Sequence, residues 1–140
     1  MTQRGSRSSW FTLSAVVVGI VALLVGCAQV GPVTQVTVPD VKSVTGTWKG
    51  VVYRTGFEPD NVTLTIQDDG SFDIVSAQRG ASSRGQGKVV ISDGRLLFEG
   101  AAGGHGVGTL LRNPAGDLVM NLDGTLSDNS TLTAKLFPVR

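Results

Sequence analysis

Residues 61–77, NVTLTIQDDGSFDIVSA, decide the fold of this chain. Apolar side chains occupy alternate positions on both sides of Asp69-Gly70. Successive side chains of a β-strand point to opposite faces, so the pattern predicts two strands that each bury one face and expose the other. Asp-Gly between two such runs favours a two-residue type I′ turn, because both central residues need a positive φ. The stretch therefore predicts an antiparallel β-hairpin.

The same alternation recurs on both sides of this hairpin. It predicts eight strands, near residues 46–54, 61–68, 71–77, 85–92, 95–100, 106–112, 117–123 and 130–137. No stretch after residue 27 keeps a helical period of 3.6 for ten residues. The predicted fold class is all-β, an eight-stranded antiparallel up-and-down meander that follows an N-terminal signal helix and a flexible tether.

The connections between the predicted strands alternate in length. Tight turns are predicted at Asp69-Gly70, at Asp93-Gly94 and at residues 113–116, where Pro114 suits a type I turn and Gly116 a left-handed position. Longer connections are predicted at residues 55–60, 78–84, 101–105 and 124–129. In a meander, alternate connections lie at the same end, so the pattern predicts a cup with one pinched end and one rim. A closed or nearly closed barrel would remove the exposed sheet edges, and an open meander or a sandwich is the alternative.

The N-terminal 26 residues have the organisation of a secretory signal peptide. Two arginines precede an uncharged apolar stretch over residues 13–25, which ends in Leu24-Val25-Gly26-Cys27. These four residues resemble the bacterial lipobox. The resemblance implies that Cys27 carries a diacylglycerol group, that the peptide is cut before Cys27, and that its new amino group receives a further acyl chain such as palmitate. The alternatives are an uncleaved transmembrane helix, which at about 25 Å is short for a bilayer core of about 30 Å, and secretion with a chance cysteine.

The lipoprotein resemblance also implies a location. Ala28, rather than aspartate, follows the cysteine, which favours the outer membrane, facing the periplasm, if the organism is Gram-negative. Residues 27–43 contain Pro32 and Pro39 and are predicted to be a lipidated tether, with residues 44–140 as the barrel domain. The alternative for the tether is a short edge strand at residues 36–38. Because Cys27 is the only cysteine, no disulfide can stabilise the domain.

The first predicted strand begins with Gly46-Thr47-Trp48. A Gly-x-Trp at this point resembles the lipocalin and avidin-like barrels of the calycin type. The resemblance implies an eight-stranded barrel with a central pocket for a small, usually apolar molecule, in which Trp48 plugs the closed end. A small eight-stranded barrel can also be filled by its own side chains, so a filled core and a real cavity both remain open.

Charge and motifs exclude several classes of function. The whole chain has a net charge of +1, and without Arg4 and Arg7 the remainder has a net charge of −1, which gives no bulk attraction for nucleic acid. His105 is the only histidine, so no histidine-based metal site is predicted. No Gly-x-Ser-x-Gly nucleophile motif occurs. We therefore expect no enzymatic activity, no metal and no cofactor.

The predicted function is that of a membrane-anchored envelope lipoprotein whose barrel binds a small apolar ligand. The candidate ligand-binding residues are Trp48, from the resemblance, and Phe57, Arg79, Arg84 and His105, from their positions in the predicted rim. The alternative is a non-enzymatic structural or interaction lipoprotein, a plugged barrel that displays its loops to an envelope protein or inhibits a secreted enzyme. The sequence leaves the ligand, the organism, the protein partner and the oligomeric state open.

Overall fold

The computed structural model describes residues 31–78 and 81–140 and confirms the all-β class. Nine strands and one short 3-10 helix make up this part of the chain. They are β1 (Thr34–Val36), η2 (Val41–Val44), β2 (Gly46–Arg54), β3 (Asp60–Ile66), β4 (Ser71–Gln78), β5 (Ala81–Ser92), β6 (Arg95–Gly100), β7 (His105–Arg112), β8 (Leu118–Thr125) and β9 (Thr131–Pro138). All of them lie within the compact unit Gly31–Arg140, which therefore contains every strand pairing of the described fold.

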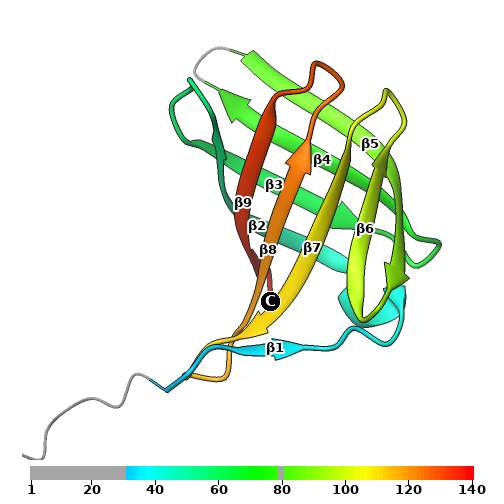
Figure 1. Cartoon of the computed structure of the whole chain (residues 1–140), viewed down its shortest axis with the longest axis vertical. Helices are drawn as coiled ribbons and strands as arrows, with labels where there is room; N and C mark the ends of the chain where they lie inside the picture. Colours follow the sequence, from blue (N-terminus) through cyan, green and yellow to red (C-terminus); the bar gives the residue numbers. More distant parts are fainter. Residues whose placement is uncertain (1–30, 79–80) are drawn as a thin grey trace, which may run out of the picture. The chain divides into compact units, whose positions relative to one another are not determined.

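Strands β2 to β9 form a closed antiparallel barrel (Figure 1). Each strand pairs with its neighbour in the sequence, and β2 pairs with β9 to close the ring. The closing pair runs from Trp48 opposite Pro138 to Arg54 opposite Leu132. The predicted up-and-down meander is thus confirmed in its closed form, and the open sheet and the sandwich are excluded.

The ninth strand, β1, lies in the stretch that was predicted to be a tether. It pairs with β7 from Thr34 opposite Arg112 to Val36 opposite Leu110. Strand β6 covers β7 only as far as Gly108, so β1 occupies the edge that the short β6 leaves free. Beyond β1, the Val38 amide donates to the Gly94 carbonyl at 2.9 Å. The prediction of a flexible tether is therefore wrong for residues 34–43, because backbone pairing and burial of Val38 fix them to the barrel.

One end of the barrel is closed by Trp48 and η2. The Trp48 side chain is 3% exposed, and its indole Nε1 donates to the Val44 carbonyl at 2.9 Å. Helix η2 starts at an N-cap, where Asp40 Oδ1 accepts from the Ser43 amide at 2.9 Å. Val44 is also buried, so η2 packs its apolar residue onto the tryptophan. As expected, this end carries the turns that follow β3, β5 and β7.

The predicted tight turns at Asp93-Gly94 and Asp69-Gly70 differ from each other in backbone geometry. Asp93 and Gly94 have φ values of 51° and 73°, as a type I′ turn requires. At Asp69-Gly70 only the glycine has a positive φ, of 80°, and the Gly70 amide donates to the Gln67 carbonyl at 3.0 Å. This is a type I turn followed by a left-handed glycine, with one residue more than the predicted hairpin loop. The type I′ prediction is wrong at this position.

At the other end, the predicted connection at residues 78–84 is wrong, because β5 begins at Ala81. The other three lie close to their predicted bounds, at residues 55–59, 101–104 and 126–130, but they close as turns rather than forming a rim of long loops. The β6–β7 turn closes with a bond from the Gly103 amide to the Gly100 carbonyl, and the β8–β9 turn with one from Asn129 to Leu126. Strand β5 begins at Ala81, so residues 81–84 continue the ladder with β4. The strands are longer than their apolar residues indicate, because backbone pairing continues through segments of glycine and serine.

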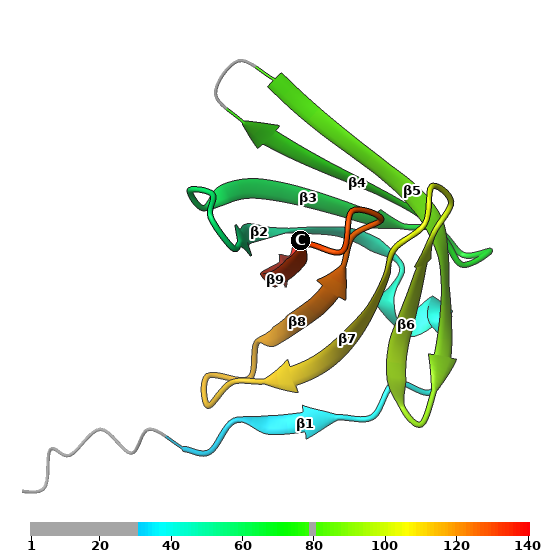
Figure 2. The ribbon, with the colours of Figure 1, turned by 45° about the horizontal axis from the view of Figure 1, so that its top comes forward.

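Strand β5 is the longest strand and extends past its neighbour β6. It pairs with β4 along its whole length but with β6 only from Gly87 to Ser92. The β4–β5 hairpin therefore projects beyond β6 at the end of the barrel opposite η2 (Figure 2). This projection forms one side of the open end.

Candidate functional site

An apolar cavity of about 260 Å³ lies inside the barrel at the end opposite Trp48. Its walls come from β3 to β9 and from the β6–β7 and β8–β9 turns. The apolar side chains that line it are Leu64, Phe72, Ile74, Phe98, Leu122 and Leu132. A water molecule takes about 30 Å³ in the liquid, so the cavity has the size of roughly nine water-sized groups. The described barrel is therefore filled at one end and hollow at the other.

Glycines occupy several inward-facing positions beside this space. Gly85, Gly106 and Gly124 line the cavity at positions where alternation would otherwise place a side chain inside the barrel. Two further inward glycines make room for aromatic rings. A Cβ on Gly87 would lie 2.7 Å from Phe72 Cε1, and one on Gly108 would lie 3.0 Å from Phe98 Cε2.

The two phenylalanines lie side by side in the cavity wall. The rings of Phe72 and Phe98 meet edge to face, with centroids 5.2 Å apart and an interplanar angle of 77°. This is a favoured arrangement for aromatic pairs. Gly87 and Gly108 therefore leave room for an aromatic pair in the cavity wall.

The inward face of β2 places one charged residue at the open end of the barrel. Trp48, Val52 and Arg54 alternate on this face, and Arg54 lies opposite Leu132, which lines the cavity. The Arg54 side chain is half-buried, and its Cζ lies 4.5 Å from the centroid of the Phe57 ring. Phe57 itself is 56% exposed in the β2–β3 loop. Sequence analysis singled out Phe57 and missed Arg54, although the alternation from Trp48 indicates its direction.

Arg84 and His105 border the cavity, but their side chains belong to the outer surface. Arg84 is 63% exposed, and its Nη2 lies 2.7 Å from Asp73 Oδ1 on the outer face of the β4–β5 hairpin. Its hydrogen bonds to Asp73, aided by one from Gln86, hold the pKa of that carboxyl below its ordinary value. His105 is exposed at the start of β7, and its neighbour Gly106 takes the inward position. Of the predicted rim residues, Arg84 therefore already uses its guanidinium in the ion pair with Asp73.

The remaining predicted site residues lie apart from the cavity or outside the described residues. Trp48 is at the closed end, as the resemblance implied, and does not line the cavity. Phe57 contacts Arg54 rather than the cavity wall. Arg79 and the predicted lipidation site Cys27 fall outside the described residues.

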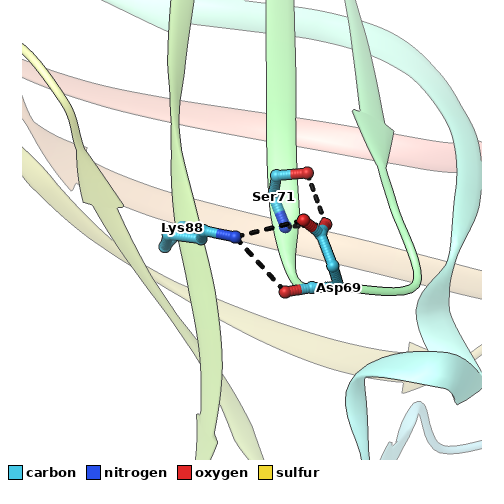
Figure 3. Close-up of polar contacts among 3 residues, drawn as sticks. All are labelled: Asp69, Ser71 and Lys88. Atoms are coloured by element: carbon cyan, nitrogen blue, oxygen red, sulfur yellow. Dashed lines mark hydrogen bonds and ion pairs between the residues drawn. The ribbon is translucent and has the colours of Figure 1, made fainter.

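A second hollow, at the closed end beside the β3–β4 turn, is polar and shallow. Asp69 dominates it: its Oδ1 accepts from the Ser71 amide at 2.8 Å and from the Ser71 hydroxyl at 2.5 Å, and its Oδ2 lies 3.3 Å from Lys88 Nζ (Figure 3). The Ser71 bonds, together with Lys88, lower the pKa of Asp69 from 3.8 to about 2. The Asp69 carboxylate is therefore already bound by Ser71 and Lys88, and these bonds stabilise the β3–β4 turn.

The structure describes residues 31–78 and 81–140. No group of three or more His, Cys, Asp or Glu side chains comes together there in a way that could hold a metal ion. Within the same residues, no helix is both long enough and apolar enough to span a bilayer.

Comparison with known proteins supports the fold. No protein-family model and no curated protein matches the chain. Among solved structures, the chain is similar to a redesigned β-barrel, with a TM-score of 0.51 and 19% sequence identity over 71% of this chain and 95% of that chain. At this identity the similarity shows the fold alone. The chain is thus a small β-barrel protein with an apolar cavity at one end.

Proposed function

We propose that this protein is an exported lipoprotein, anchored through Cys27, whose barrel binds a small apolar molecule. The observation that carries the proposal is the apolar cavity of about 260 Å³ at the open end of the barrel. Ligand sites are concave and mostly apolar with a few polar groups, and this cavity has that composition. An eight-stranded barrel can be filled by its own side chains, so a cavity at one end favours a binding role over a purely structural one.

The path of the chain indicates which way the open end of the barrel would face relative to the membrane. Strand β1 joins the barrel beside the turn between β7 and β8, at the end opposite the cavity. Only the six residues 28–33 lie between the proposed anchor Cys27 and β1, so the two are at most about 25 Å apart along an extended chain. A barrel tethered in this way would turn its open end away from the membrane. The ligand would then be exchanged with the aqueous compartment, which is the periplasm if the membrane is a Gram-negative outer membrane.

A second candidate function is an interaction role without enzymatic activity. Its specific support is a pair of exposed aromatic residues on the outer face of the barrel, Tyr53 on β2 and Phe137 on β9, which are 53% and 45% exposed. Such side chains are enriched where proteins meet. The tight turns at the open end offer little loop surface for display, so a partner would have to bind the outer face instead.

A titration of the unit Gly31–Arg140 with 1-octanol tests the binding proposal. This neutral probe has nine non-hydrogen atoms, which matches the cavity volume. The backbone amide signals of Gly85, Gly106 and Gly124 in a two-dimensional NMR spectrum report on the cavity wall. We expect millimolar 1-octanol to shift these signals and to leave those at the Trp48 end unchanged.

A matched pair of substitutions supplies the control. Ile74 lines the cavity, and the adjacent Val75 faces outward and is 37% exposed. Ile74→Trp should fill the cavity and abolish the shifts, whereas Val75→Trp should leave them unchanged. The binding proposal fails if the native protein shows no shift, or if Ile74→Trp responds to 1-octanol as the native protein does.

A further inference from the structure

One wall of the cavity at the open end consists of main chain without side chains. Gly106 on β7 and Gly124 on β8 both line the cavity, and they lie directly opposite each other in the β7–β8 ladder. A Cβ built on Gly124 would lie 3.6 Å from the Gly106 Cα, so the two main chains lie side by side. Because glycine has no Cβ, a molecule in the cavity can lie directly against this glycine wall, Gly106 and Gly124.

The wall on the other side of the cavity is aliphatic. In the closed ring of strands β2 to β9, strands β3 and β4 lie across the barrel from β7 and β8. Leu64 on β3 and Ile74 on β4 are opposite each other in their ladder, and both line the cavity. Their side chains therefore form the wall that faces the two glycines. A space bounded by one flat face and one aliphatic face is suited to a flat molecule.

An aromatic pair lines the cavity on the side of the closed end. Phe72 and Phe98 both line the cavity, and their rings meet edge to face with centroids 5.2 Å apart. The Phe72 ring lies over Gly87 and the Phe98 ring over Gly108. These two glycines are the next inward positions towards the closed end after the cavity glycines of β5 and β7. A further ring in the cavity can therefore contact this pair in one of the arrangements that aromatic rings favour.

The charged residues that border the cavity point away from it. Of the described residues that line the cavity, Arg84 and His105 are the two that can carry a charge. Arg84 is bound to Asp73 on the outer face, and His105 is exposed beside the inward Gly106. A charge inside an apolar cavity needs a partner there, because its burial is costly without one. The cavity therefore favours an uncharged molecule.

The volume of the cavity sets the size of the ligand, and the inference rests on the proposed binding function. An engineered cavity of about 150 Å³ holds one benzene ring, so a proportionally larger ligand has about ten non-hydrogen atoms in the 260 Å³ available here. Two fused six-membered rings have this size. We infer that the ligand is an uncharged, flat, fused-ring aromatic compound, which lies between the glycine wall and the aliphatic wall and contacts Phe72 and Phe98.

Three probes that share one fused-ring skeleton test this inference. 2-Naphthol is flat and uncharged, decahydro-2-naphthol is its saturated and puckered counterpart, and 2-naphthoate is flat and charged. Each is titrated into the native unit Gly31–Arg140 at pH 7, with the same glycine amide signals as the readout. We expect 2-naphthol to bind about threefold to tenfold more tightly than decahydro-2-naphthol, as contacts between aromatic rings provide. 2-Naphthoate should bind more weakly than 2-naphthol, because its charge would lose water without gaining a partner.

A matched pair of glycine substitutions then tests the glycine wall. Gly124→Ala adds one methyl group there, and its Cβ would lie 3.1 Å from the His105 carbonyl oxygen, so a small shift accommodates it. We expect this variant to bind 2-naphthol no more tightly than decahydro-2-naphthol. Gly31→Ala is the control, because its Cβ would lie at an ordinary contact distance, 3.5 Å, from Pro114 in the β7–β8 turn at the closed end. This control should keep the native preference.

The outcomes separate this inference from the proposed function. Decahydro-2-naphthol binding as tightly as 2-naphthol to the native protein, or a preference for 2-naphthol that survives Gly124→Ala, would overturn the flat-ring inference and leave the apolar binding site standing. 2-Naphthoate binding as tightly as 2-naphthol would overturn the preference for an uncharged ligand. The comparison of probes on the native protein needs no substitution, so it holds even if a variant fails to fold. If neither 1-octanol nor any fused-ring probe shifts the signals, the binding function itself is contradicted, and the flat-ring inference with it.

Discussion

Replacing Trp48 with phenylalanine tests how the closed end of the barrel is stabilised. The indole is 3% exposed, and its Nε1 donates to the Val44 carbonyl at 2.9 Å, which is the side-chain hydrogen bond between η2 and β2. Phenylalanine keeps an aromatic ring on the inward face but cannot donate this bond. Val44 is itself 1% exposed, so water has little access to the carbonyl that the substitution would leave without a partner.

The size of the effect follows from two contributions. A buried acceptor that loses its partner costs about 1–3 kcal/mol, and the space left by the smaller ring adds about 1 kcal/mol. We therefore expect Trp48→Phe to lower the free energy of unfolding by about 2–4 kcal/mol, a large share of the roughly 5–15 kcal/mol typical of a domain. The midpoint of thermal unfolding should fall by about 10–20 °C.

Urea unfolding of Gly31–Arg140, followed by far-ultraviolet circular dichroism, measures this loss. Tyr53→Leu is the matched control, because Tyr53 is an aromatic residue of the same strand that is 53% exposed on the outer face; this variant should stay within about 0.5 kcal/mol of the native protein. If Trp48→Phe also stays within that range, the bond to η2 does not stabilise the closed end and the reasoning is refuted.

Two further predictions concern the β3–β4 turn and the N-terminus. Asp69 has a pKa of about 2 in the folded protein, below its ordinary 3.8, so it contributes stability above about pH 4 that is lost as the pH falls towards 2. Asp69→Asn has no carboxylate to titrate, and its urea midpoint should fall less than that of the native protein between about pH 5 and pH 2.5; equal falls would contradict this role. Cys27→Ser in the full-length chain should move the expressed protein from the detergent phase to the aqueous phase in a Triton X-114 partition, because the proposed acyl chains can no longer be attached. An unchanged partition would count against lipidation at Cys27.

The fold was predictable where hydropathy and turn chemistry agree. Residues 61–77 alternate clearly, and Asp93-Gly94 adopts the predicted turn because both residues accept a positive φ. The ninth strand was predicted only as an alternative, at residues 36–38 instead of 34–36, because Thr34–Val36 is short and lies between two prolines. Its pairing depends on the edge of β7 that β6 leaves free. The local sequence cannot show that this edge of β7 is unpaired, because the edge forms only when the barrel closes.

The cavity was hidden from sequence analysis for a different physical reason. Hydropathy detects a buried face by the side chains that it contains, and an inward glycine contributes none. Residues 81–84 were assigned to a loop for lack of apolar side chains, yet they continue the ladder with β4, and Gly85, at the start of the predicted strand, lines the cavity opposite Ile74. Arg54 was missed by the converse error, because a charged residue at a strand end is usually taken to face solvent.

One sequence pattern could have corrected both errors, the missed cavity and the missed Arg54. Once Trp48 is assigned to the inside of the barrel, strict alternation along β2 places Arg54 inside as well, and the same rule applied backwards from Val89 places Gly87 and Gly85 inside on β5. The direction of one buried side chain therefore predicts which glycines and charged residues of the same strand face inward, where hydropathy alone gives no signal.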